Sequence, residues 1–414
     1  MKKLLAMLLP FAMLMSLCAC GGGAASSTPV AGTEAEDSEE PAAEVTEDPS
    51  AEAVDWQSVY DEAASLYYTD YDYPAAFEKL QGAEKSDNAS VLYLLGLCCY
   101  NGNGTERDAA KGAELLTKAA ELGSISAKFT LAGAYATGNG VEADSEKADE
   151  LYKSFLTEAE SAESADTPEY GRMLYNITRC YIYGYGTKVD KENAAKYAKM
   201  ALESGNAGVI STYSLAAAYE SGKMGEGNTD KARKLYADIF PQIEELANKG
   251  ISDAERFLAQ YYFYGDGGVA QDYAKSVEWY EKAAEHGNSG SMFNLGTMYS
   301  HGNGVEQDYA KALEWYEKAA ELGNANAMVN LGTMYSHGDG GVEKDDAKAL
   351  EWYEKAAELG NAYAMYNLGV MYANGNGVEQ DYAKAMEWYE QAVSLGNELA
   401  AENIANLRNQ GLVS

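Results

Sequence analysis

Three kinds of residue in this chain could take part in chemistry: histidines, cysteines and closely spaced glycines. His301 and His337 occupy matching places in two similar passages, each directly before a glycine. Together they could supply two metal ligands, but a zinc site needs at least three protein ligands, and no cysteine or carboxylate cluster accompanies this pair. A histidine in the last turn of a helix is favoured by the helix dipole. We therefore expect ordinary helix-end histidines and no metal site.

Pairs of glycines one residue apart could cradle a phosphate, as Gly302 and Gly304 might suggest in the stretch GNGVEQDYAKALEWYEKAAELGN (302–324). Phosphate-binding loops need a strand before the loop and a helix after it. Here the pair follows a helical pattern, and nearly the same stretch returns at 375–397. The glycines are therefore predicted to make turns between helices, and no nucleotide or other cofactor is expected.

Three cysteines, Cys98, Cys99 and Cys180, lie in the body of the chain at apolar positions of predicted helices. An exported domain built on disulfides would carry many paired cysteines. These thiols are predicted to act as small buried hydrophobic residues, in preference to redox groups. The stability of the fold must then come from packing.

The elements that position these residues repeat along the chain. Trp279, Trp315, Trp352 and Trp388 are separated by 36, 37 and 36 residues. A fixed period of this length is typical of repeat architectures. Eight successive units are each marked by a turn glycine: Gly102, Gly138, Gly184, Gly222, Gly265, Gly302, Gly338 and Gly375.

Each unit reads as two amphipathic helices. The segment before a turn glycine, such as 327–338, carries apolar residues at i, i+3, i+4 and i+7, and we name it the A helix. The segment after the turn, such as 308–324, gives a B helix with Asp308 at its N-cap and Gly323 just beyond its C-terminus. One such pair cannot bury its apolar face, but stacked pairs can. The predicted fold class is all-α, an α-solenoid of antiparallel helix pairs.

The repeat pattern resembles a known family. In the sixth unit the matching residues are Leu295, Gly296, Tyr299, Gly302, Gly304, Val305, Asp308, Lys311, Ala312, Trp315, Tyr316, Lys318, Ala319, Ala320 and Gly323. They resemble the Sel1-like repeat, a branch of the tetratricopeptide-like (TPR-like) helical repeats. The resemblance implies a right-handed superhelix whose A helices line the concave side. It covers eight repeats at 89–397, with a plainer TPR-like helix pair at 55–88 and a capping helix at 398–414.

Two units depart from this rhythm. The stretch 157–169 lengthens the region after the second B helix, and 237–250 adds about two turns, containing Pro241, to the fourth. Insertions in solenoids usually project on one face. We expect both insertions to be accommodated without ending the stack.

Residues 1–20 read as a bacterial lipoprotein signal peptide. Lysines, an apolar core and small residues follow one another, and the ending Leu17-Cys18-Ala19-Cys20 resembles the lipobox. The resemblance implies a lipid on Cys20 after cleavage. An ordinary signal peptide is the alternative, and a transmembrane helix is disfavoured because the apolar run is short. We expect an exported protein, lipid-anchored to the outer face of the cell membrane or to the outer membrane.

Residues 21–54 form an acidic, low-complexity segment, and no Lys or Arg occurs between Lys3 and Lys79. Such a composition buries too little apolar surface to offset its ordering entropy, so a disordered tether is predicted. An acidic recognition tail is the alternative.

The chain is strongly anionic, with 65 acidic against 31 basic residues and a net charge of −34. Such a surface is repelled by nucleic acid and by anionic lipid headgroups. Nucleic acid is therefore excluded as a partner, and membrane attachment is expected only through the lipid on Cys20.

Catalysis is disfavoured. Some secreted, cysteine-rich members of the family that the chain resembles have been linked to penicillin binding and weak β-lactam hydrolysis. That chemistry uses a serine with a lysine three residues on, and no Ser-x-x-Lys occurs in the sequence. Ser86-Asp87-Asn88 spells another β-lactamase motif but lies between two predicted helices, where such residues cap and turn. No catalytic residue is assigned.

The predicted A helices carry a column of rings. Nine residues before the turn glycine, six of the eight units have an aromatic residue. By comparison with TPR helices this position faces the groove, although packing between A helices is an open alternative. The groove candidates come from this column and from positions five and one before the glycine: Tyr93, Phe129, Tyr175, Arg179, Tyr183, Tyr213, Arg256, Tyr264, Phe293, His301, His337 and Tyr366.

Rigid aromatic rings with nearby hydrogen-bonding groups suit an extended peptide or a glycan. The sequence therefore predicts a non-enzymatic protein-interaction scaffold on the bacterial cell surface, with a protein or peptide in its concave groove. Binding of a carbohydrate or a peptidoglycan fragment is the alternative. Tyr175, Arg179, Tyr183 and Phe293 are the favoured contacts.

Overall fold

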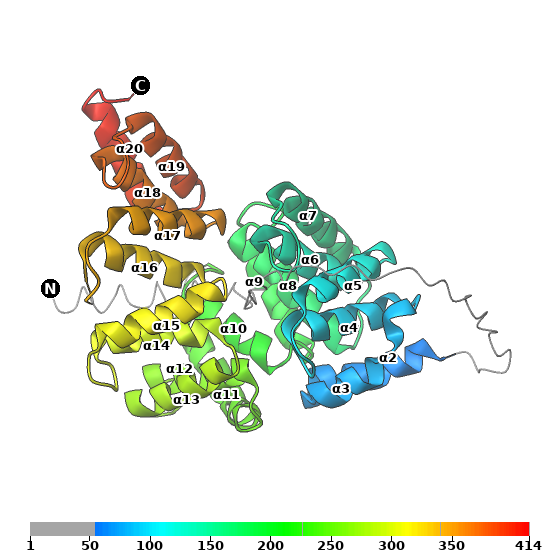
Figure 1. The fold of residues 1–414 in the computed structure, drawn as a ribbon. Coiled ribbons are helices and arrows are strands. Elements are labelled where there is room, and N and C mark those ends of the chain that lie inside the picture. Colours follow the sequence, from blue (N-terminus) through cyan, green and yellow to red (C-terminus); the bar gives the residue numbers. More distant parts are fainter. Residues whose placement is uncertain (1–53, 226, 340, 414) are drawn as a thin grey trace, which may run out of the picture.

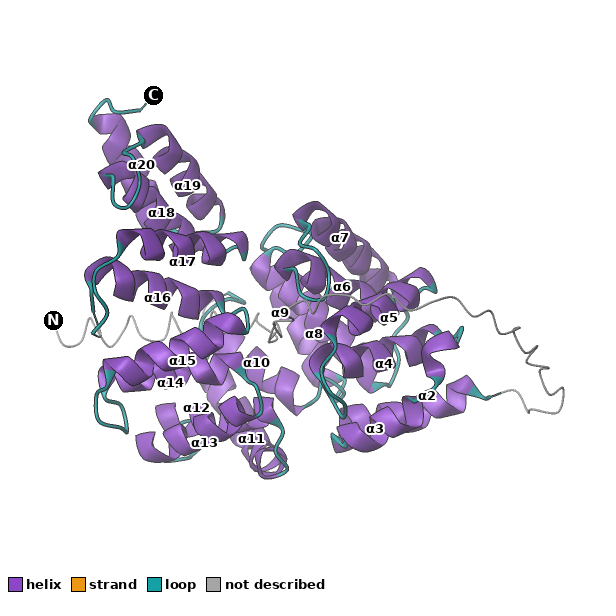
Figure 2. Cartoon of the chain, viewed as in Figure 1, coloured by secondary structure: helices purple, strands orange, loops and turns teal. Residues whose placement is uncertain are grey.

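The computed structural model describes residues 54–225, 227–339 and 341–413, and within these ranges every regular element is a helix (Figures 1 and 2). The predicted signal peptide, the predicted lipid site Cys20 and nearly all of the tether predicted at 21–54 lie outside the described residues. The prediction of an all-α solenoid of antiparallel helix pairs is confirmed.

Eight helix pairs make up the stack. The A helices are α4 (Ala89–Asn101), α6 (Ile125–Thr137), α8 (Pro168–Tyr183), α10 (Val209–Glu220), α12 (Ser252–Tyr264), α14 (Ser289–His301), α16 (Ala325–His337) and α18 (Ala362–Asn374). The B helices are α5 (Ala109–Glu121), α7 (Ser145–Ser161), α9 (Lys191–Glu203), α11 (Thr229–Asn248), α13 (Tyr273–Glu285), α15 (Tyr309–Glu321), α17 (Asp346–Glu358) and α19 (Tyr382–Ser394). The stack is preceded by α2 (Trp56–Ser65), the π-helical turn η2 (Leu66–Asp70), α3 (Tyr73–Leu80) and the short 3₁₀ turn η3 (Ala83–Lys85), and it ends with α20 (Glu398–Asn409).

Each helix packs mainly against its neighbours in the chain, so the pairs follow one another from α2 to α20 (Figure 1). In the middle of the stack, A helices also contact one another directly: α6 with α8, α8 with α10, and α10 with α12. Helices approach most closely on the inside of a curve. The A helices therefore line the inner face, as the repeat resemblance implied, and we use that name for their surface below.

Polar side chains set the helix boundaries. Asp308 caps α15 by accepting a hydrogen bond from the backbone N–H of Lys311 at 3.0 Å. Asn324 caps α16 in the same way, and its Nδ2 also donates to the carbonyl of Ser289, one repeat earlier, at 3.3 Å. The capping asparagine therefore links adjacent units as well as starting a helix.

The two turn glycines have different tasks. Gly302 ends α14 with φ +72°, the left-handed conformation that side chains disfavour. Gly304 lies against the start of the preceding B helix, where an added Cβ would come within 2.5 Å of the carbonyl oxygen of Tyr273. Gly104, Gly140 and Gly377 meet the corresponding backbone at the start of the preceding pair's second helix. The Gly-x-Gly spacing therefore serves stacking, which agrees with the prediction that it makes turns.

Inside each C-terminal unit, a glycine of the A helix receives a tyrosine ring of the B helix. A Cβ on Gly296 would lie 2.6 Å from the ring of Tyr316. The pairs Gly332–Tyr353 and Gly369–Tyr389 repeat this arrangement at 2.6 and 2.5 Å. The absent side chain lets the two helices approach around a ring that is almost fully buried.

Three apolar clusters run along the stack and share bordering residues. Leu151 packs against the N-terminal and the middle cluster, and Trp279 packs against the middle and the C-terminal cluster. The other three repeated tryptophans are half-buried against the C-terminal cluster. The apolar spine is therefore continuous, as the sequence period required.

The N-terminal segment folds back over the inner face. The hydroxyl of Tyr60 on α2 donates to the carboxylate of Glu169 on α8 at 2.5 Å. The guanidinium of Arg172 lies 5.3 Å from the ring centroid of Tyr68 in η2. Tyr93 is only 3% exposed, in one cluster with Tyr68. The inner face of the first units is thus covered by the chain itself.

The two predicted insertions extend helices. The B helix α7 has 17 residues and α11 has 20, against 13 in most B helices. Pro241 lies inside α11, which continues to Asn248. As predicted, the stack continues beyond both insertions. Among the described helices, none combines the length and the apolar character needed to cross a bilayer.

Candidate binding surface

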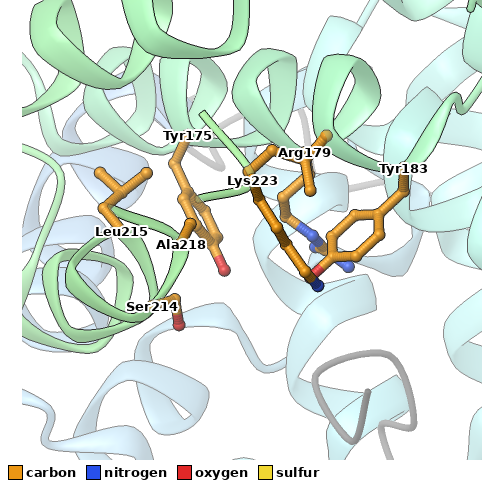
Figure 3. Close-up of a pocket in the computed structure, with 8 residues that line it drawn as sticks. Tyr175, Arg179, Tyr183, Ser214, Leu215, Ala218 and Lys223 are labelled. Atoms are coloured by element: carbon orange, nitrogen blue, oxygen red, sulfur yellow. The ribbon is translucent and has the colours of Figure 1, made fainter. Parts of the chain in front are cut away.

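The inner face is hollowed between α8 and α10 (Figure 3). The hollow has a volume of about 350 Å³, part of which is open solvent. It is a shallow depression of the inner face. Its lining residues are Tyr175, Arg179, Ile182, Tyr183, Ser214, Leu215, Ala218 and Lys223.

Helix α8 supplies three of the four favoured groove residues. Tyr175, Arg179 and Tyr183 are spaced four residues apart, so the helix places them on one stripe facing the hollow. All three side chains are half-buried. The structure therefore brings together a set of residues that sequence reasoning had selected one by one.

Aromatic rings orient the cation of Arg179. Its guanidinium lies 4.9 Å from the ring centroid of Phe129 on the preceding A helix and 5.8 Å from that of Tyr175. A guanidinium within about 6 Å of a ring centroid is attracted by the ring's quadrupole. These contacts restrict the Arg179 side chain while keeping its positive charge at the hollow.

A second cation enters from the loop after α10. The ammonium group of Lys223 lies 4.6 Å from the ring centroid of Tyr183 and donates to its hydroxyl at 3.4 Å. The side chains of Arg179, Tyr183 and Lys223 converge on one side of the hollow, with Tyr175 beside them (Figure 3). Among the eight described residues that line the hollow, two carry a cation and none is acidic.

Stacked rings continue from the hollow towards α7. Tyr183 stacks on Tyr185 with 5.5 Å between ring centroids. Tyr185 stacks on Tyr152 at 4.8 Å with an interplanar angle of 13°. Tyr183 and Tyr185 are half-buried at this edge of the hollow, and the buried ring of Tyr152 packs behind them.

The remaining column residues have a different environment. Tyr93, Phe129, Tyr213 and Phe293 are each at most 6% exposed, so they offer little surface to a partner. Phe293 packs on Tyr316 of its own B helix, with 5.9 Å between centroids. The alternative left open in the sequence, packing of the rings, holds for these four. Their burial comes from the B-helix tyrosines and, for Tyr93, from the N-terminal segment.

The other candidates are spread over the stack. Arg256 is 8% exposed and lies over the ring of Phe257 at 4.2 Å, and Tyr366 is half-buried against Tyr389. Tyr264 is exposed at the end of α12. None of these three lines the hollow between α8 and α10.

The histidines end helices, as predicted. The Nδ1 atoms of His301 and His337 lie 2.8 and 2.9 Å from the carbonyl oxygens of Thr297 and Thr333, one turn earlier. Both side chains are exposed. Within the described ranges no group of three or more His, Cys, Asp or Glu side chains is arranged to hold a metal ion.

The other chemical candidates have structural roles. Asn88 of the Ser-Asp-Asn motif caps α4 by accepting from the N–H of Ser90 and Val91, and the hydroxyl of Ser86 accepts from the N–H of Asn88. Burial raises the pKa of Cys98 and of Cys180 to about 12. Thiols with such a pKa are protonated at neutral pH and unreactive.

The family of the chain follows from its repeats. A family model described as Sel1 repeat matches eight segments: residues 89–124, 125–154, 172–206, 209–237, 252–288, 289–324, 325–361 and 362–397. The chain belongs to the Sel1 repeat family. Sel1 repeat proteins generally mediate protein–protein interactions and are generally non-catalytic.

Relatives of this Sel1 repeat chain include an uncharacterized protein of Neisseria meningitidis serogroup B, 28% identical over 265 residues, which are 57% of this chain and 52% of that protein. An ERAD-associated E3 ubiquitin-protein ligase component of Arabidopsis thaliana is 25% identical over 150 residues, covering 36% of this chain and 22% of that protein. The chain therefore spans about half the length of the first relative and about a fifth of the second.

Two solved Sel1-type structures resemble the chain. A protective antigen of uropathogenic Escherichia coli is 27% identical, with a TM-score of 0.40 and coverage of 86% of this chain and 80% of that one. A Sel1 repeat protein of Oxalobacter formigenes is 25% identical, also with a TM-score of 0.40, covering 92% of this chain and 98% of that one.

Sequence reasoning missed Lys223 and Tyr185. Lys223 lies in an irregular loop where the repeat register gives no alignment. Tyr185 did carry a signal, because the residue after the turn glycine is asparagine or aspartate in six of the eight units, such as Asn103, Asn139 and Asn303, and tyrosine here. A departure from the repeat at a stacking position marks a residue with another task.

Proposed function

We propose that this chain is a non-enzymatic scaffold that binds an extended segment of a partner protein on the inner face between α8 and α10. One observation carries the proposal: Tyr175, Arg179 and Tyr183 share a stripe of α8 and meet Lys223 around one hollow. The membership in a family of interaction proteins supports it.

The residue types suit peptide recognition. Tyrosine and arginine are enriched among residues that dominate binding energy, because they present large, stiff contact areas and directed hydrogen bonds. Leu215 and Ala218 supply an apolar floor beside them. A shallow hollow would receive part of one side chain of an extended segment whose backbone follows the inner face.

The location is part of the proposal. The lipobox-like ending at Cys20 would place the protein outside the cytoplasm, on the outer face of the cell membrane or in the outer membrane. A cysteine carrying several acyl chains is sufficient for stable attachment. Anchoring would raise the local concentration of the stack near partners at the same membrane.

Site-specific photo-cross-linking in living cells tests the proposal. A benzophenone amino acid at Tyr183 is compared with one at Tyr309, which is 45% exposed at the start of a B helix. We expect one discrete protein adduct from position 183 and none of the same mass from position 309. Equal adducts from both positions, or none from 183, would contradict binding at the hollow.

The half-buried rings of Tyr183 and Tyr185 favour one second candidate, a carbohydrate or peptidoglycan fragment. Sugar rings stack on such surfaces through their apolar faces. Titration calorimetry with soluble wall fragments distinguishes the two candidates. Saturable heat that disappears in Tyr183→Ala would favour the glycan, and absence of heat would leave the protein partner.

A further inference from the structure

Two cationic side chains line the hollow between α8 and α10, and the same chain contains an acidic segment before its folded part. Resting on the proposed function, we propose that this hollow binds an acidic peptide, and that its resident ligand is residues 33–40 of this same chain. A protein partner must displace that segment. The acidic leader then regulates the site in addition to connecting it to the membrane.

The lining selects for carboxylates. Arg179 and Lys223 are the charged members among its eight residues, and both are positive at neutral pH. Arg179 is oriented by the rings of Phe129 and Tyr175, and Lys223 by Tyr183. A preoriented guanidinium favours carboxylate acceptors, which it can bind through two parallel hydrogen bonds.

The charge of residues 33–40 is complementary to that of this lining. They read TEAEDSEE, with carboxylates at positions 34, 36, 37, 39 and 40. No Lys or Arg between Lys3 and Lys79 neutralises them within their own region. The segment is followed directly by Pro41, which disfavours continuation of a regular helix from it. An extended acidic run is the form that a shallow inner-face site accepts.

The segment can reach the hollow. The hydrogen bond between Tyr60 and Glu169 fixes α2 to the start of α8 at 2.5 Å. Arg179 is ten residues further along α8, about 15 Å at 1.5 Å per residue. The path along the chain from Val54 to Tyr60, and then through the side-chain contact to Glu169, adds about 27 Å. The whole path from Val54 to Arg179 is therefore about 42 Å long. Glu40 is 14 residues before Val54, a reach of about 46 Å when extended.

Tethering makes even weak binding effective. A connection that must stretch close to its full length presents its ligand below the millimolar effective concentration of a slack short linker, on the order of 200 µM. If the free segment binds with a Kd on the order of 100 µM, the tethered copy reduces the apparent affinity of a competitor by about threefold. Because the contact is ionic and partly exposed, salt weakens it.

Zero-length cross-linking gives the first test, on the complete chain in detergent. Carbodiimide joins the Lys223 ammonium group to a carboxylate with loss of water, and mass spectrometry identifies the linked peptides. We expect Lys223 joined to residues 33–40 within one chain. Lys223→Arg keeps the charge and removes the link. Mixing ¹⁵N-labelled and unlabelled chains separates the cases: links only between chains would overturn the intramolecular assignment, and links to other carboxylates only would overturn the ligand.

A labelled peptide of residues 31–42 gives the second test. We compare the wild-type chain with one in which the five carboxylates at positions 34–40 are replaced by amides. The peptide should bind the amide variant about threefold more tightly, and Arg179→Ala in that variant should abolish binding. Equal affinity for both chains would overturn the proposal. The photo-cross-linking above reports on the partner separately, so loss of partner binding at Tyr183 with intact peptide binding would reject only the proposed function.

Discussion

The ring of Tyr353 fills the space that a side chain on Gly332 would need: a methyl group on the Cα of Gly332 would lie 2.6 Å from that ring. The ring comes from α17 and the glycine from α16, the two helices of one repeat. This contact recurs in the units on either side. It explains why the A helix keeps a residue that normally weakens helices.

Gly332→Ala therefore tests the packing inside a repeat. Alanine favours a helix by about 1 kcal/mol over glycine. Overpacking against Tyr353 should cost about 1–3 kcal/mol, so the variant should be less stable than the wild type. Gly133→Ala is the matched control, because the nearest atom to its Cβ would be the Tyr152 hydroxyl at 3.6 Å. Urea unfolding followed by circular dichroism should show a lower free energy of unfolding for Gly332→Ala and a higher one for Gly133→Ala than for the wild type. A stabilised Gly332→Ala would contradict the contact.

Gly304→Ala tests the packing between repeats. The substitution combines a left-handed backbone, φ +74°, with a Cβ 2.5 Å from the Tyr273 carbonyl oxygen. Gly323→Ala has the same backbone cost, φ +79°, but meets no atom within 4 Å. We expect a loss of about 1–2 kcal/mol at Gly323 and a clearly larger loss at Gly304. Equal unfolding midpoints for the two variants would show that Gly304 has no stacking role.

Most of the fold could be predicted from the sequence, because each repeat satisfies the same local rules. The period of Trp279 and its three equivalents fixed the unit, and Asp308 and Gly302 fixed the ends of its helices. The contact of α2 with α8 could not be predicted. It joins Tyr60 to Glu169, and nothing in the repeat register links these distant residues.

The candidate site could be predicted only in part. Counting from the turn glycine selected the α8 residues Tyr175, Arg179 and Tyr183, which do line the hollow. The same counting also selected Tyr213 and Phe293, which are buried. Position within a repeat cannot separate the two outcomes, since burial depends on how tightly the neighbouring units and B-helix rings close over each position.

The raised pKa of Asp266 predicts that the stability of the fold depends on pH. Burial raises this pKa to about 6, with the nearby Glu220 adding to the effect. Between pH 4 and 6 the unfolded chain ionises this group and the folded chain does not, so its contribution to stability falls as pH rises. Asp266→Asn removes that loss. Its melting temperature should exceed that of the wild type at pH 7.5, and the difference should shrink towards pH 4.5. A constant difference would contradict the raised pKa.

The buried thiols predict slow labelling. Burial raises the pKa of Cys98 and Cys180 to about 12, and that of Cys99 is raised for the same reason. In a chain with Cys18 and Cys20 replaced by serine, a thiol reagent at pH 8 should react only as fast as the structure opens. Urea at a concentration that unfolds the protein should make all three thiols react rapidly. Rapid labelling of the native chain would place them at the surface.

The account depends most on the role of Arg179 in binding a partner. The direct measurement is the affinity of the protein captured at Tyr183 for the purified chain and for its Arg179→Ala variant, with Lys282→Ala on a B helix as the control. Truncation of an interface arginine at the centre of a site costs about 2 kcal/mol, roughly 30-fold in Kd. We predict that loss for Arg179→Ala, with unchanged helical circular dichroism and an unchanged Kd for Lys282→Ala. Wild-type affinity in the Arg179→Ala variant would contradict the account.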